Sequence, residues 1–96
     1  MMVVLTYDVN VIDTNGEKRL RNVAKVCEKY GVRVQNSVFE LLVDPAQLTT
    51  LKAQLKRIID PSRDSIRFYR LGKSFENKIE VIGRTPLLEQ GKPIIL

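Results

Sequence analysis

Two amphipathic helical segments, each set between short β-forming runs, limit the possible folds of this chain more than any other feature. Segment 17–30 has apolar residues at the helical period, and segment 45–59 has a second such set. Because each segment has a single apolar face, we expect two helices that pack on the same side of a sheet. The two stripes are Leu20, Val23, Ala24 and Cys27, and then Leu48, Leu51, Leu55, Ile58 and Ile59.

The sequence also predicts where these helices begin and end. Thr14 and Glu17 have the spacing of a capping box, and Gly31 is placed to stop the first helix in a left-handed conformation. The second helix is predicted to start at Asp44-Pro45, a cap followed by proline at the first helical position. Asp60-Pro61 is predicted to end it.

The strands are predicted in the remaining segments. Residues 2–8 and 65–71 read as single strands, and 33–43 reads as two strands divided by a bend at 35–37. A further strand is predicted at 78–82. The order predicts an α+β, ferredoxin-like βαββαβ fold, in which two helices cover one face of an antiparallel sheet.

The other sheet face is expected to form a homodimer. Residues 1–83 are predicted to be the ferredoxin-like domain, and 84–96 a C-terminal extension. Its apolar end, Pro93 to Leu96, follows a Gly91-Lys92 break. We expect this extension to add a strand to the sheet edge of the partner subunit.

Length and composition fit one globular domain of 96 residues, with 44% hydrophobic and 28% charged residues. No apolar run approaches the roughly 20 residues of a membrane span, and the single Cys27 offers no disulfide framework. We therefore expect a cytoplasmic protein without membrane contact. The net charge of +5 and the pI near 9.6 are typical of nucleic-acid binding, although an ordinary basic surface is the alternative.

Four stretches together resemble the CRISPR-associated protein 2 family: "TYDV", "KRLRNVAKVCEKYG", "RVQNSVFE" and "FYRLG". The ending "VIGRTPLLEQGKPIIL" resembles the type I-C branch of that family. The resemblance implies a homodimer that cleaves single-stranded RNA or double-stranded DNA with a metal ion. It also implies a role in spacer acquisition, as a scaffold between integrase dimers of CRISPR-associated protein 1. Segment 84–96 is our candidate surface for that integrase.

Asp8 is the candidate catalytic and metal-binding residue. Hydrolysis of a phosphodiester needs Mg²⁺ or Mn²⁺ to activate water, and such ions prefer carboxylate oxygens. Asp8 ends an apolar strand and matches the metal-binding aspartate of the family, whereas the chain has no His to act as base. One Asp per subunit is a poor site, but two across a two-fold axis would share one ion. A turn residue after the strand is the alternative.

Three further residues are predicted to support this site. Ser37 matches a recurring serine of the family and would orient a phosphate or a water by a hydrogen bond. Tyr7 and Phe39 have a possible mixed role near the metal, besides packing. Glu40 is either a second acid of the site or a solvent-facing strand residue, and the sequence favours the latter.

Basic residues on the first helix predict a nucleic-acid surface. They recur at steps of three and four, opposite the apolar stripe, and are Lys18, Arg21, Lys25 and Lys29. By family position, Arg19, Arg21 and Arg33 are predicted phosphate contacts, and Lys25 joins them in the predicted site. Such contacts position a duplex without reading its bases. An ordinary solvated helix face is the alternative.

The function predicted from the sequence is therefore that of a CRISPR adaptation subunit with a weak Mg²⁺-dependent endonuclease activity. One alternative is a non-catalytic DNA-binding scaffold for the integrase. Others are a ferredoxin-like toxin ribonuclease, similar to the virulence-associated protein D family, and a small-molecule regulatory domain of ACT type.

Overall fold

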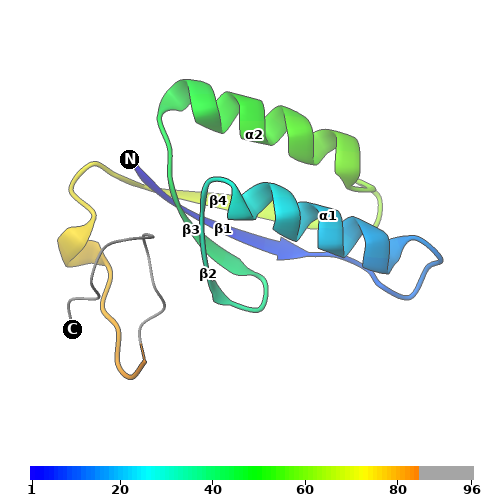
Figure 1. Cartoon of the computed structure of the whole chain (residues 1–96), viewed down its shortest axis with the longest axis horizontal. Helices are drawn as coiled ribbons and strands as arrows, with labels where there is room; N and C mark the ends of the chain where they lie inside the picture. Colours follow the sequence, from blue (N-terminus) through cyan, green and yellow to red (C-terminus); the bar gives the residue numbers. More distant parts are fainter. Residues whose placement is uncertain (85–96) are drawn as a thin grey trace.

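The computed structural model describes residues 1–84, which form a four-stranded antiparallel sheet with two helices on one side (Figure 1). The strand order is β2-β3-β1-β4, so β3 lies between β1 and β2, the two strands that α1 connects. This is the ferredoxin-like arrangement, and the predicted fold class is confirmed. The elements are β1 (Met2–Asp8), α1 (Gly16–Glu28), β2 (Gly31–Gln35), β3 (Val38–Leu42), α2 (Pro45–Ile58), β4 (Ser65–Gly72) and a 3₁₀ turn (Glu76–Lys78).

The sheet has one face that the helices cover and one helix-free face. Successive side chains of β1 point alternately to these two faces. Val3, Leu5 and Tyr7 are at most 5% exposed and belong to the core. Residues 4, 6 and 8 therefore point to the other side, where no α-helix of residues 1–84 lies (Figure 1). The core is completed by buried residues of both helices, of which Val23, Cys27, Leu51 and Leu55 are at most 2% exposed.

The start and end of α1 differ from the prediction. Asn15, not Thr14, is the cap residue of α1, and no side chain caps the helix. Gly31 does not take a left-handed conformation but begins β2. A Cβ at position 31 would lie 2.0 Å from the carbonyl oxygen of Glu40, so this glycine is explained by close strand approach.

The start of α2 agrees with the prediction. The Asp44 carboxylate accepts a hydrogen bond from the backbone N–H of Gln47 at 2.7 Å, and Pro45 is the first helical residue. The Gln47 side chain accepts in return from the backbone N–H of Asp44 at 2.9 Å, which completes a capping box.

The predicted strand 78–82 is wrong for this chain within the described residues. The chain leaves the sheet at Gly72, whose φ of +82° is a left-handed conformation that favours glycine, and continues into the 3₁₀ turn. No strand of residues 1–84 pairs with the segment that follows, and Val81 and Ile82 are exposed. A strand needs a neighbour for its backbone groups. Most of the predicted extension, 85–96, lies outside the described residues.

Candidate functional site

Asp8 lies at the end of β1 with an exposed side chain on the helix-free face. Its carboxylate accepts no hydrogen bond and forms no ion pair with any part of the chain that the structure describes. The turn that follows is instead stabilised by two other side chains. Asn10 Oδ1 accepts from the N–H of Ile12 at 2.9 Å, and Asp13 Oδ1 accepts from the N–H of Asn15 at 3.0 Å. The geometry thus favours Asp8 as a ligand over Asp8 as a turn residue.

Ser37 lies next to the end of β1. The backbone N–H of Tyr7 donates to the carbonyl oxygen of Ser37 at 3.1 Å, and the Tyr7 hydroxyl donates to the carbonyl oxygen of Asn36 at 3.1 Å. These two bonds hold the β2–β3 turn against the residue that precedes Asp8. The structure therefore brings Ser37 and Asp8 to the same end of the sheet.

Tyr7 and Phe39 lie on the covered face, opposite the Asp8 side chain. Phe39 has no exposed surface, and its ring centroid is 6.1 Å from that of Tyr7. Burial raises the pKa of the Tyr7 phenol, while the nearby charge of Arg33 acts in the opposite direction. Neither side chain is placed to bind an ion at Asp8, so their support of the site is through packing.

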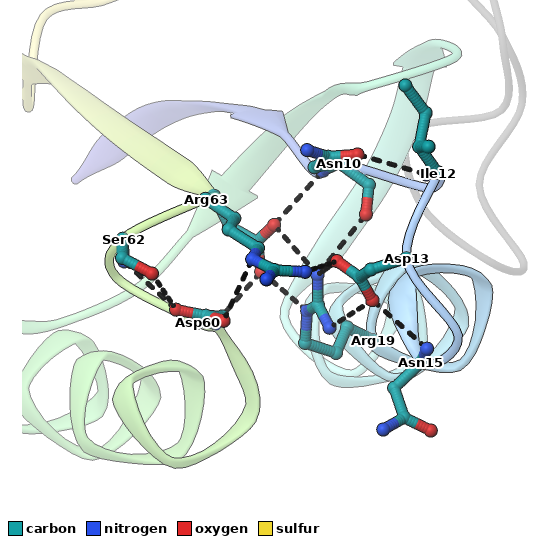
Figure 2. A network of polar contacts seen from close by, with 9 residues as sticks. Asn10, Ile12, Asp13, Asn15, Arg19, Asp60, Ser62 and Arg63 are labelled. Carbon is teal, nitrogen blue, oxygen red and sulfur yellow. Dashed lines mark hydrogen bonds and ion pairs between the residues drawn. The ribbon is translucent and has the colours of Figure 1, made fainter.

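Arg19 occupies a different place from the phosphate contact predicted for it. Its side chain is only 13% exposed, and its guanidinium lies between two carboxylates (Figure 2). Nη1 and Nη2 donate to Asp13 at 2.9 and 2.7 Å, and Nε donates to Asp64 at 2.7 Å. Hydrogen bonds from Arg19 hold the pKa of the Asp13 carboxyl well below its usual range. This geometry makes Arg19 a structural residue in this chain.

Asp64 was not predicted, and it is the most buried carboxylate of the described residues, with no exposed side-chain surface. It accepts from Arg19, from the backbone N–H of Asn10 at 3.0 Å and from that of Asp60 at 2.9 Å. Burial raises the pKa of Asp64, but the hydrogen bonds from Arg19, Asp60 and Asn10 outweigh it and lower the pKa. The sequence offered one indication of its role: Asp64 stands directly before a predicted strand and four residues after Asp60, which was predicted to end the second helix.

Three predicted basic residues remain exposed. Arg21 and Lys25 lie on the outer face of α1, as does Lys18, and the exposed Lys29 is the C-cap residue of this helix. Arg33 on β2 is 44% exposed, stands 3.8 Å from a carboxylate oxygen of Glu28, and lies over the ring of Phe39. The stripe is thus on the surface, where phosphate contact is sterically open.

Two carboxylates of the described strands lie on this face, Asp8 and Glu40, but Glu40 is the register partner of Val4, four residues before Asp8 on β1. No group of three or more His, Cys, Asp or Glu side chains that could hold a metal occurs among residues 1–84. Mg²⁺ commonly binds through one or two carboxylates and keeps several waters. Asp8, which is exposed and has no partner in the described part of the chain, therefore fits as half of a shared site and not as a complete one.

A model of the family described as CRISPR associated protein Cas2 matches residues 1–79. The chain belongs to this family. It is 50% identical over 95 residues to the CRISPR-associated endoribonuclease Cas2 3 of Rhodospirillum rubrum, with 99% of this chain and 100% of the relative covered. It is 52% identical to the CRISPR-associated endonuclease Cas2 of Halalkalibacterium halodurans, with 99% of each covered.

The solved Cas2 structures agree with the fold. The crystal structure of Streptococcus pyogenes Cas2 at pH 6.5 superposes with a TM-score of 0.77 at 55% identity, covering 86% of this chain and 100% of that chain. The family resemblance read from the sequence is confirmed, while the type I-C branch stays a prediction. Within residues 1–84, neither helix has the length and apolar character needed to cross a membrane.

Proposed function

We propose that this Cas2-family protein is a metal-dependent endonuclease, in which two Asp8 carboxylates of a homodimer hold one Mg²⁺ or Mn²⁺ ion. The observation that carries the proposal is the exposed carboxylate of Asp8 at the end of a buried strand, which has no bonding partner within residues 1–84. Relatives that are about half identical over nearly the whole chain are named endonuclease or endoribonuclease, which supports nuclease activity on RNA or DNA.

The helix-free face supports the proposed dimer. Val4 is the register partner of Tyr69, and Leu42 lies beside Met2 on the same face. Tyr69 and Leu42 are 47% and 44% exposed, so large apolar side chains meet solvent there. An isologous contact through this face would place the same residue on both sides of the axis, which is what a shared Asp8 site requires.

In this proposal, different residues of the chain would bind the metal, orient the reacting groups and bind the substrate. When bound, the ion would offset phosphate charge and lower the pKa of an attacking water. Asp8 would hold the ion, and the Ser37 hydroxyl would orient a phosphate oxygen or a water. Arg21, Lys25 and Arg33 would bind backbone phosphates, which fixes the substrate without selecting a sequence. The chain has no His, so proton transfer would pass through water or carboxylate.

A second function, a non-catalytic scaffold in spacer acquisition, is favoured by the exposed basic face of α1. In it the dimer would bind duplex DNA and the CRISPR-associated protein 1 integrase, with segment 84–96 as the candidate contact. Family membership favours both functions over a toxin ribonuclease or an ACT-type domain. A cytoplasmic location remains our prediction.

The test compares wild type with Asp8→Ala on labelled single-stranded RNA and double-stranded DNA, in Mg²⁺, Mn²⁺ or EDTA. We expect wild type to cleave only with metal, and Asp8→Ala to lose cleavage while it still dimerises and binds. Glu17→Ala is the matched control, because it removes one exposed carboxylate away from the site. Binding without cleavage by wild type would leave the scaffold function. Equal cleavage by Asp8→Ala would reject the proposed site.

A further inference from the structure

The chain around Asp8 is held on both sides, although its carboxylate is held by nothing in the described residues. Before it, the N–H of Tyr7 is bonded to Ser37. After it, the N–H of Asn10 donates to Asp64 Oδ1 at 3.0 Å, and Val9 is buried in the core. The backbone is fixed at these two points, and it sets the direction in which the Cα–Cβ bond of Asp8 leaves the chain.

Asp64 is also connected to Asp8 across the β1–β4 strand pair. It directly precedes Ser65, and Ser65 is the register partner of Asp8 in the β1–β4 ladder. Its carboxylate joins three segments that meet here: the loop after β1, helix α1 through Arg19, and the loop before β4 through Asp60. Figure 2 shows Asn10 and Asp13 gathered around the Arg19 guanidinium in this region.

Stability alone is a poor explanation for a buried ion pair, because the cost of removing two charges from water offsets most of their attraction. What such a pair does supply is directional geometry. Arg19 extends this geometry, since Nη2 also donates to the carbonyl oxygen of Asn10 at 3.2 Å. The loop that follows Asp8 is thus bonded to both Asp64 and Arg19 through the backbone of Asn10.

We propose that Asp64, with Arg19 as its partner, is a positioning residue that fixes the direction of the Asp8 carboxylate. The inference rests on the proposed function, in which Asp8 binds the metal. Removing the charge of Asp64 loosens the loop after Asp8 and broadens the directions that its carboxylate samples. In a dimer both copies are affected, so the loss acts twice on one shared ion.

We expect substitution of Asp64 to lower the Mn²⁺ affinity and kcat but to leave substrate binding nearly unchanged. Asp64→Asn should weaken Mn²⁺ binding at Asp8 about tenfold or more and lower kcat by a similar factor, because small displacements of a reacting group are costly. KM for RNA or DNA should change little, since Arg21, Lys25 and Arg33 make no hydrogen bond or ion pair with Asp64 within residues 1–84. Arg19→Lys keeps the charge but cannot reach both carboxylates, so its loss should be intermediate.

The experiment titrates Mn²⁺ by electron paramagnetic resonance on the full-length chain and measures kcat and KM for each variant. Leu48→Ala is the matched control: it destabilises the core from α2, far from the Asp64 contacts, and should keep the Mn²⁺ affinity of wild type. Thermal unfolding confirms that every variant is folded at the assay temperature. If Asp64→Asn does not fold, Arg19→Lys decides the question.

The outcomes are distinct. Wild-type Mn²⁺ affinity and kcat in folded Asp64→Asn, or in Arg19→Lys where that variant decides, overturn the positioning role. An equal loss in Leu48→Ala overturns it as well, because general stability would then explain the effect. An Asp8→Ala variant that binds Mn²⁺ like wild type overturns the proposed metal site itself, and with it this inference.

Discussion

Asp8 and Ser65 are register partners at the end of the β1–β4 ladder, so their side chains share the helix-free face. Directly opposite residues of an antiparallel pair have Cβ atoms roughly 5 Å apart. Ser65 is therefore the nearest position across the sheet from which the charge at the candidate metal site can be altered.

We expect Ser65→Lys to weaken Mn²⁺ binding at Asp8 by about tenfold or more. An ammonium beside the carboxylate repels the ion and competes for the ligand, and about 1.4 kcal/mol corresponds to a factor of ten. Isothermal titration calorimetry with Mn²⁺ measures the change. Ser74→Lys, an exposed position outside the site, adds the same charge and should leave the affinity unaltered. Equal effects of the two substitutions would contradict a local site.

Acid should destabilise the fold through Asp13 and Asp64, whose pKa values are lowered by their bonds to Arg19. A carboxyl with a depressed folded pKa stabilises the fold above its unfolded pKa of about 3.9. That stability is lost as pH falls through the folded pKa. We expect Tm to be level above about pH 5 and to drop below about pH 4 in wild type.

The Asp64→Asn variant should lower stability by about 3 kcal/mol at pH 7, as expected when one partner of a buried ion pair is removed. Its difference from wild type should shrink below about pH 4, because protonation removes the same charge from the natural residue. Urea unfolding at pH 7 and pH 3 measures both values. A difference independent of pH would show that the charge of Asp64 is not what stabilises the loop.

Gly16→Ala should disturb the loop after Asp8. A Cβ at position 16 would lie 2.1 Å from the carbonyl oxygen of Asn10, a backbone atom that must then move. We expect a loss of about 1–3 kcal/mol, the usual range for overpacking, with weaker cleavage. Glu17→Ala alters the neighbouring exposed residue and should change stability by less than about 0.5 kcal/mol. Chemical denaturation of the two variants gives the comparison.

Nucleic-acid binding should depend on Arg21 and Lys25 but not on the charge of Lys56 on α2. Each phosphate contact removed should reduce the slope of log affinity against log salt by about 0.9 on duplex DNA. Arg21→Ala and Lys25→Ala are expected to weaken binding to all sequences alike. Fluorescence anisotropy at several salt concentrations measures the slope. An equal effect of Lys56→Ala would indicate that only total charge matters.

If the proposed dimer forms through the helix-free face, a charge placed on that face should disrupt it. Leu42→Asp should shift the protein to monomer, because an unpaired carboxylate would be buried against the partner sheet. Ile12→Asp is the control, since Ile12 is 93% exposed in the loop after β1. Light scattering coupled to size-exclusion chromatography reports the mass. A dimer that survives Leu42→Asp would place the interface elsewhere.

The helices and core strands were predictable from the sequence because their apolar periods are strong. Leu51 and Leu55 mark one face of α2, and Asp44 with Pro45 marks its start. The strand expected at 78–82 was not found, because its β-forming residues have no strand to pair with among residues 1–84. Periodicity describes which side of a segment is apolar, but not whether a neighbouring strand is present.

The site was predictable only in part for a similar reason. Asp8 stood out because an acid ended an apolar strand, and its carboxylate has no bond to any of residues 1–84 in the structure. Arg19 looked like its basic neighbours on the helix, since the sequence does not say which arginine a distant carboxylate will hold. Asp64 supplies that carboxylate from 45 residues further along the chain.

The Asn10–Asp64 bond joins residues 54 positions apart, and the Arg19–Asp64 bond joins residues 45 apart. Contacts of such long sequence separation form only when most of the chain is available to fold. A ribosome-bound chain that has not yet released β4 carries Asp8 but lacks the acid that fixes the loop behind it. In the proposed function, such a chain would carry the metal ligand Asp8 before the bonds that position it can form.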